Sequence, residues 1–275
     1  MKFITDIHTH SFYSFDGIDL LKDIIAGAQE RGVAFYGVSE HADYDIYLKH
    51  GASMHRILEE EEYFHEARHL QEDYAGVMNV LVGAELGYSP DPRVCDGYQK
   101  LIEKYAPDFI VNSVHSCKGD DYYDGVPYRN ADGSPRDIKA VYEEYLDLIL
   151  SSVNAPYAYD IIGHIGYADR YAPSGSAHIT LAEYGDKIDA ILQAIIEKNK
   201  ILEVNAKRGL EGALPSDEIV KRYYALGGRN ISYASDTHTV AGVCNDRERV
   251  VAYLKSIGFT HLTVPCKGEY IKVEL

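Results

Sequence analysis

The chain has 275 residues, of which 46% are hydrophobic and 25% are charged. These proportions are typical of a globular protein with a sizeable core, and they exclude a disordered or fibrous chain. The 27 Lys and Arg residues against 43 Asp and Glu residues give a formal net charge of −16, which argues against a general nucleic-acid binder because the surface repels phosphate backbones.

Short apolar runs alternate with helical patterns along the chain. Runs with strand character occur at 4–9, 33–39, 77–84, 109–114, 159–163, 201–205, 231–235 and 262–264. Helical patterns occur at 18–31, where Asp19 is the expected N-cap, and at 55–74, 96–105, 136–150, 181–199, 216–226 and 246–257. About seven alternations predict an α/β fold with a parallel sheet, and the length favours a closed (β/α) barrel over an open doubly wound sheet.

The chain carries no pattern of a secreted or membrane protein. Four cysteines without a C-x-x-C pair are typical of reduced thiols in the cytoplasm. No apolar run reaches the roughly 18 residues of a membrane span, and the first residues lack a signal-peptide pattern. We therefore expect a cytoplasmic protein with no membrane partner. No linker or change of composition divides it, so we expect residues 1–275 to form a single domain.

Polar side chains follow nearly every predicted strand. They are His8 and His10 with the nearby Asp16, then His41, Glu85, His115, His164, and finally Asp236 and His238. The carboxyl ends of barrel strands share one face, where active sites lie. Residues two apart on a strand point to the same side, so His8 with His10, and Asp236 with His238, are expected to face one cavity.

Six imidazoles and three carboxylates without thiolates suit Zn, Mn or Fe(II) rather than Ca²⁺ or a structural zinc site. Nine ligands exceed the needs of one ion and suit two or three divalent ions, which could share a hydroxide nucleophile. One histidine at a strand end is more often structural than a ligand. The whole set is hard to explain structurally, because buried imidazoles and carboxylates are costly without partners.

The other histidines are interpreted as structural or solvated residues. They are His50, His55, His65, His69, His178 and His261. His65 and His69 have the spacing of a helical metal pair, but the Glu-rich surroundings favour a solvated helix face. The sequence contains no phosphate-binding P-loop, dinucleotide fingerprint or nucleophile elbow.

The sequence resembles the polymerase-and-histidinol-phosphatase (PHP) family in the segment from Asp6 to Ser11 and at the nine positions above, in the same order. The resemblance implies a distorted (β/α)7 TIM-like barrel with three divalent metal ions. It implies that His8, His10, Glu85 and Asp236 hold the first ion, that Glu85 bridges to a second ion held with His115 and His164, and that Asp16, His41 and His238 hold the third.

Within this family the chain is similar to the histidinol-phosphatase branch. The support is the length, Asp16, and the segment from Ile201 to His238. The resemblance implies a phosphomonoesterase acting on L-histidinol phosphate in histidine biosynthesis, with Glu85, Asp236 and His238 in the catalytic centre. Two rival functions stay open: a phosphoesterase acting on a nucleotide or short oligonucleotide, and a non-catalytic metal-binding protein.

Several further residues have expected roles near the centre. Arg170 and Arg208 follow strand ends and could grip phosphate oxygens, although surface salt bridges would explain them equally well. Asp6 is a candidate to orient a ligand imidazole. Glu40, and the segment 117–123, depart from the branch and are expected to alter the leaving-group pocket.

Overall fold

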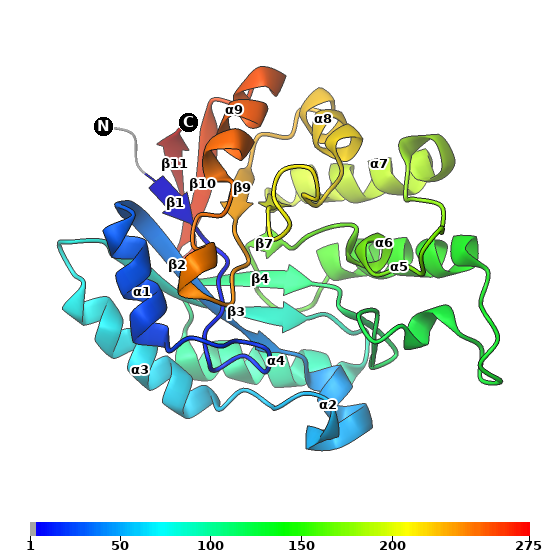
Figure 1. Ribbon diagram of the computed structural model, residues 1–275, viewed down its shortest axis with the longest axis horizontal. Helices are drawn as coiled ribbons and strands as arrows, with labels where there is room; N and C mark the ends of the chain where they lie inside the picture. The colour runs from blue at the N-terminus through cyan, green and yellow to red at the C-terminus, as the bar shows by residue number, and fades with distance from the viewer. Residues whose placement is uncertain (1–3) are drawn as a thin grey trace.

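Seven parallel strands form the centre of the molecule in the computed structural model, which describes residues 4–275 (Figure 1). They are β1 (Ile4–Asp6), β2 (Val33–Ala42), β3 (Asn79–Gly87), β4 (Phe109–Ser113), β7 (Ile161–Ile162), β8 (Ile201–Asn205) and β9 (Ile231–Ala234). Each strand pairs in parallel with the next one in this order. The strand order follows the chain, as expected for a barrel built from successive β-α units.

The sheet closes just beyond its two edge strands. The backbone N–H of His10 donates to the carbonyl of Thr237 at 2.8 Å, and the N–H of Asp236 donates to the carbonyl of His8 at 2.9 Å. Thr9 and Thr237 thereby form a parallel bridge between the segments that follow β1 and β9. The predicted distorted (β/α)7 barrel is confirmed, with its seam next to the predicted ligands.

Helices surround the strands (Figure 1). They are α1 (Leu21–Glu30), α2 (Tyr44–His50), α3 (Glu60–Asp73), α4 (Pro92–Tyr105), α5 (Ile138–Val153), α6 (Tyr167–Arg170), α7 (Leu181–Glu197), α8 (Asp217–Ala225) and α9 (Arg247–Ile257). Each long helix buries one apolar stripe; in α5 it runs through Val141, Tyr145 and Ile149 at helical spacing. None of the helices within residues 4–275 is long and apolar enough to cross a lipid bilayer.

A C-terminal hairpin packs against residues of the barrel interior. Its strands β10 (His261–Cys266) and β11 (Glu269–Glu274) pair antiparallel. Val264 and Val273 from this hairpin pack with Phe109 and other residues inside the barrel. The sequence predicts only one strand here, at 262–264, and β11 was not predicted. The turn Lys267-Gly268 has positive φ at both residues, which is the geometry that two-residue hairpins favour.

The structure differs from the sequence-based predictions at other places as well, among them helices α2 and α6, which were not predicted. Helix α3 begins at Glu60, so residues 55–59 are a loop rather than helix. Asp19 does not cap α1, because its carboxylate accepts from the backbone N–H of Val240 instead. A short hairpin of β5 (Ser116–Cys117) and β6 (Asp120–Asp121), which was not predicted, follows β4.

Candidate metal centre

All nine predicted ligands come together at the carboxyl ends of the barrel strands. Glu85 lies at the centre of the group and is fully buried. Its Oε2 lies 3.1 Å from His8 Nε2 and 3.4 Å from His10 Nε2. Its Oε1 lies 3.1 Å from His115 Nε2 and 2.9 Å from His164 Nε2. One carboxylate thus faces two pairs of imidazoles.

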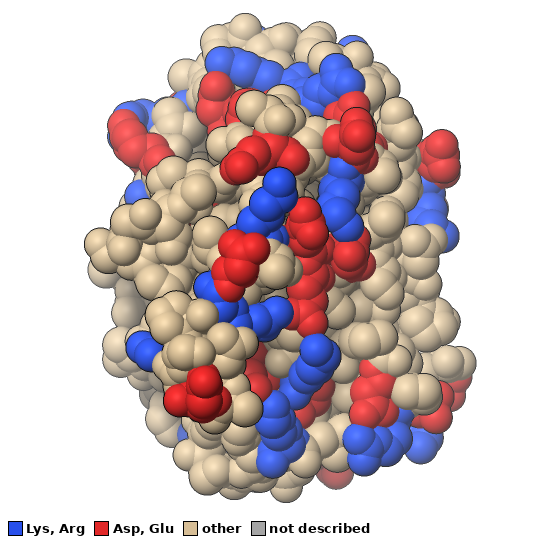
Figure 2. Space-filling model, turned by 90° about the vertical axis from the view of Figure 1, so that its right-hand side faces the viewer, with Lys and Arg blue, Asp and Glu red and all other residues tan. Residues whose placement is uncertain are grey.

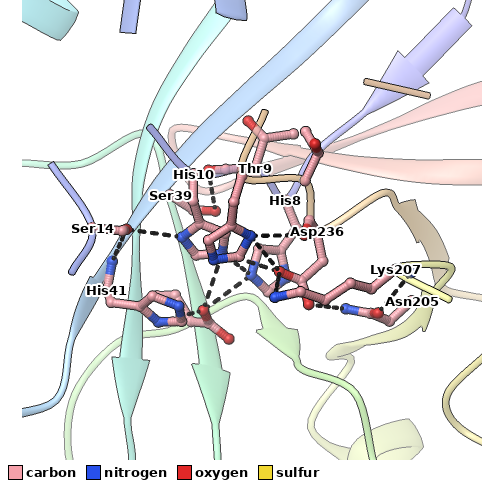
Figure 3. A network of polar contacts seen from close by, with 12 residues as sticks. His8, Thr9, His10, Ser14, Ser39, His41, Asn205, Lys207 and Asp236 are labelled. Atoms are coloured by element: carbon pink, nitrogen blue, oxygen red, sulfur yellow. Dashed lines mark hydrogen bonds and ion pairs between the residues drawn. The ribbon is translucent and has the colours of Figure 1, made fainter. Parts of the chain in front are cut away.

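The remaining four residues extend this group on the seam side. His10 Nε2 lies 3.4 Å from Asp236 Oδ1, and Figure 3 shows His8, His10, His41 and Asp236 turned toward one another. His41 Nδ1 lies 2.9 Å from Glu85 Oε2. Asp16, the most exposed of the nine, lies 3.0 Å from His238 Nε2 and 3.8 Å from His41 Nε2.

Asp236 reaches the centre by a turn rather than by strand alternation. Strand β9 ends at Ala234, and Asp236 has a φ of 49°, in the left-handed region that side chains other than glycine rarely adopt. Such backbone strain persists only where the surroundings hold it, and it is concentrated at functional sites. Asn205 Nδ2 donates to Asp236 Oδ2 at 2.9 Å and fixes the carboxylate.

Hydrogen bonds to Nδ1 orient two of the imidazoles. His8 Nδ1 faces Glu203 Oε1 at 2.5 Å, and His115 Nδ1 faces Asp43 Oδ1 at 2.7 Å. A carboxylate can only accept, so each Nδ1 carries a proton, which leaves Nε2 as the atom that can present a lone pair to a metal ion. Carboxylate partners of this kind are typical of metal-bound histidines.

A third imidazole is oriented through a serine. The Ser14 hydroxyl donates to Glu40 Oε2 at 2.6 Å, so its oxygen accepts from His10 Nδ1 at 3.1 Å. Glu40 is fully buried and also accepts from the backbone and hydroxyl of Ser11. The expectation that Glu40 alters the leaving-group pocket is therefore wrong; it acts on His10 through Ser14.

The donor set fits divalent cations. His8 Nε2 and His10 Nε2 face each other at 3.0 Å although both are expected to be lone-pair atoms. His41 Nδ1 and Glu85 Oε2 are buried without a hydrogen-bond partner in residues 4–275, although they face each other at 2.9 Å. Burial raises the pKa of Glu85, but the imidazoles of His8, His115 and His41 outweigh this effect and hold the pKa well below its usual range. A buried carboxylate that stays ionised beside several imidazole nitrogens suits Zn, Mn or Fe(II).

Two glycines leave room for groups that support the centre. A Cβ atom on Gly163 would lie 2.1 Å from Ser113 Oγ, which donates to Glu85 Oε1 at 2.6 Å. A Cβ atom on Gly87 would lie 2.0 Å from Asp43 Oδ1, the partner of His115. Both contacts are too short for any side chain, so only glycine permits them.

A cavity of about 210 Å³ opens onto the centre. Arg170 lines this cavity. Its Nη2 donates to the Gly212 carbonyl at 3.1 Å, while its buried Nε has no hydrogen-bond partner in residues 4–275. Lys207 lines it too, with Nζ 3.3 Å from Asp236 Oδ1. Arg208 is exposed and does not line the cavity; its guanidinium lies 5.1 Å from the ring centre of Tyr171, which does.

Several supporting residues were not predicted from the sequence. Lys207 lines the cavity, whereas its neighbour Arg208 does not. Lys207 could have been found in the sequence because it closely follows Asn205, at the end of a predicted strand. Asp43 lies two residues after His41 and could have been found by the same spacing. Asp6 was expected to orient an imidazole, which is wrong: its carboxylate accepts from the backbone N–H groups of Ser235 and Cys244.

Comparisons with known proteins agree with this geometry. The family model of the PHP domain matches residues 6–207. A probable histidinol-phosphatase from Clostridium acetobutylicum is 27% identical, with 86% of each chain covered. A histidinol-phosphatase from Lactococcus lactis is 26% identical over 94% of this chain and 92% of the relative.

A similar fold is found among solved structures. The crystal structure of the Lactococcus lactis histidinol phosphate phosphatase, complexed with zinc, L-histidinol and phosphate, is 24% identical to this chain. It has a TM-score of 0.81, with 98% of this chain and 99% of that chain covered. The likeness therefore extends over the whole barrel, including the C-terminal hairpin beyond the residues matched by the family model.

Proposed function

The chain belongs to the PHP domain family, and from this premise we propose that it is a metal-dependent phosphomonoesterase that hydrolyses L-histidinol phosphate to L-histidinol and phosphate. The observation that carries the proposal is the convergence of imidazole Nε2 atoms on the buried Glu85 carboxylate, beside a cavity lined by Arg170. The curated relatives named histidinol-phosphatase supply the choice of substrate.

We propose three divalent ions at this centre, of Zn, Mn or Fe. Two groups of facing ligand atoms, His8 with His10 and Asp236, and Glu85 with His115 and His164, support the first two sites. His41 and His238, which form a further group with His10 and lie near Asp16, would hold the third. Bound divalent ions supply Lewis acidity and lower the pKa of a bound water.

The protein's own groups would bind and orient the phosphate. Arg170 offers its unpartnered Nε and Lys207 offers its ammonium to the phosphate oxygens, where they would stabilise the charge that develops in the transition state. Arg208 would act from the rim of the cavity. Glu203, Asp43 and Ser14 hold the Nδ1 protons of their imidazoles, which keeps the Nε2 lone pairs aimed at the centre.

A small substrate fits the charge of the molecule better than a long nucleic acid. The net charge is −16. Figure 2 shows Asp and Glu side chains next to Lys and Arg side chains on one face, with no continuous basic band among the residues coloured there. Long phosphate backbones need such a band, whereas one phosphate ester needs only the cations inside the cavity.

The test is phosphate release by the metal-loaded protein. We expect L-histidinol phosphate to exceed p-nitrophenyl phosphate and a 3′,5′-bisphosphonucleotide by about a hundredfold in kcat/KM, since a site that pairs with a substrate's polar groups rejects analogues without them. Glu85→Gln should remove the activity. Faster cleavage of the nucleotide would assign the chain to a nucleotide substrate, and no hydrolysis with metal bound would indicate a non-catalytic protein.

A further inference from the structure

The cavity beside the candidate metal centre has a buried carboxylate that the hydrolysis mechanism does not use. This residue is Asp121, which lies in β6. It is 3% exposed and lines the cavity. Within residues 4–275 no Lys or Arg forms an ion pair with it. Its nearest imidazole is that of His55, whose Nε2 lies 3.7 Å from Asp121 Oδ2.

The two oxygens of Asp121 have different surroundings. Oδ1 accepts from the backbone N–H of Tyr123 at 2.8 Å and faces the hydroxyl of Tyr167 at 3.4 Å. Oδ2 accepts no hydrogen bond from a residue of the described chain and is therefore available to a ligand. Burial raises the pKa of Asp121 to about 7, because the nearby positive groups do not compensate the lost hydration.

The lining of the cavity offers two kinds of groups to a substrate. Arg170 and Lys207 provide positive charge for a phosphate group. Asp121, with the rings of Tyr123 and Tyr167, provides a carboxyl group without a Lys or Arg partner in residues 4–275 and aromatic faces, which together suit a cationic amine. A phosphate ester whose alcohol carries an ammonium group would use both kinds of groups.

We propose that Asp121 is a specificity-determining residue that binds the ammonium group of the substrate through Oδ2. This inference rests on the proposed hydrolysis of L-histidinol phosphate and names the group that selects that amino alcohol. Binding of the ammonium supplies the cationic partner that no Lys or Arg of residues 4–275 provides to this buried carboxylate. An analogue without the amine leaves Asp121 buried without a cation and is disfavoured.

The test compares Asp121→Asn with the wild type on two substrates. These are L-histidinol phosphate and 3-(imidazol-4-yl)propyl phosphate, which differ only in the amine. Asn retains an oxygen for the Tyr123 N–H but loses the charge. We expect kcat/KM for L-histidinol phosphate to fall about tenfold to a hundredfold, mainly through KM, while the value for the deamino compound stays within twofold.

A binding measurement and a matched control complete the experiment. Calorimetry should show weaker binding of L-histidinol, but unchanged binding of 3-(imidazol-4-yl)propanol, to Asp121→Asn. Asp120→Asn is the control, because Asp120 is the adjacent carboxylate of β6 but pairs with Lys49 and His50 instead of lining the cavity.

The outcomes separate the two proposals. An equal loss on both phosphates, or no loss on either, overturns the role of Asp121 while leaving the histidinol-phosphatase activity in place. A wild-type protein that hydrolyses p-nitrophenyl phosphate but not L-histidinol phosphate overturns the proposed substrate, and the role of Asp121 is then rejected with it.

Discussion

The orientation of individual side chains at this centre is fixed by hydrogen bonds to residues that do not themselves face the candidate metal sites. Glu203 is the clearest case, since Oε1 accepts from His8 Nδ1 while Oε2 accepts from the backbone N–H of His164 at 2.8 Å. One buried carboxylate therefore orients two candidate ligands from different strands. Its position on β8 between Leu202 and Val204 was visible in the sequence, but its partners were not.

We expect Glu203→Gln to raise the metal concentration needed for half-maximal activity by about tenfold to a hundredfold. Both carboxylate oxygens accept from N–H groups, so the amide of Gln must place its NH₂ against one of them. Activity should be titrated with Mn²⁺ or Zn²⁺, and the melting temperature recorded in parallel.

The control for this variant is Glu269→Gln, an exposed residue of the C-terminal hairpin. It should leave the metal titration unchanged. If Glu203→Gln lowers only the melting temperature and not the apparent metal affinity, Glu203 is structural and does not position His8.

At the scale of the elements, close approaches between neighbouring strands decide which groups reach the centre. Strand β4 contributes Ser113 to Glu85 only because Gly163, after β7, has no side chain. In the same way Gly87, at the end of β3, leaves space for Asp43 after β2. In the sequence these glycines are not distinguishable from other residues at strand ends, so their role was not predicted.

Gly163→Ala is predicted to lower kcat by at least about tenfold, because the methyl group displaces Ser113 from Glu85 and small misplacements of catalytic groups are costly. Steady-state phosphate release measures this effect. Gly185→Ala in α7 is the matched control, since a Cβ atom there meets nothing within 4 Å. Full activity of Gly163→Ala would show that Ser113 does not support the centre.

At the scale of the whole molecule, the candidate ligands come from or follow six strands, namely β1, β2, β3, β4, β7 and β9. They also flank the seam where Thr9 meets Thr237. Bound metal would therefore join both edges of the sheet and stabilise the closed barrel. A ligand at a hundred times its Kd stabilises the folded state by about 2.7 kcal/mol.

Removing the metal should lower the melting temperature by about 5–10 °C at pH 8, on the scale expected for a chain of this size. In the metal-free protein burial opposes protonation of His8 and His115, but neighbouring carboxylates outweigh it and raise the pKa of both rings well above 6.5. Stability from these protonated rings is present at low pH and lost as pH rises through the raised pKa values.

Metal binding instead needs unprotonated Nε2 atoms, so its contribution grows as pH rises. The difference in melting temperature between metal-loaded and chelator-treated protein should accordingly be larger at pH 8 than at pH 6. Calorimetry at both pH values measures it, with Glu85→Gln as the variant expected to lose the difference. An equal or larger difference at pH 6 would contradict this coupling.

The sequence by itself favoured a closed parallel barrel and identified the nine candidate ligands, and its family resemblance implied the (β/α)7 form. This was possible because strand-end position follows from local hydrophobic patterns, and because parallel strands of a barrel bring their carboxyl ends to one face. The ligand roles of these residues, the number of ions and the single domain from 1 to 275 stay predictions that the experiments above and limited proteolysis can check.

Only the tertiary structure decided the groups that act across the chain. Asp43, Glu203 and Ser14 orient imidazoles, Lys207 lines the cavity where Arg208 does not, and Asp121 lies in it with His55 nearby but no Lys or Arg partner in residues 4–275. These relations depend on side-chain direction and on distances between residues far apart in sequence, such as the 195 positions between His8 and Glu203. Local patterns carry no information on such contacts, because packing of the complete barrel sets them.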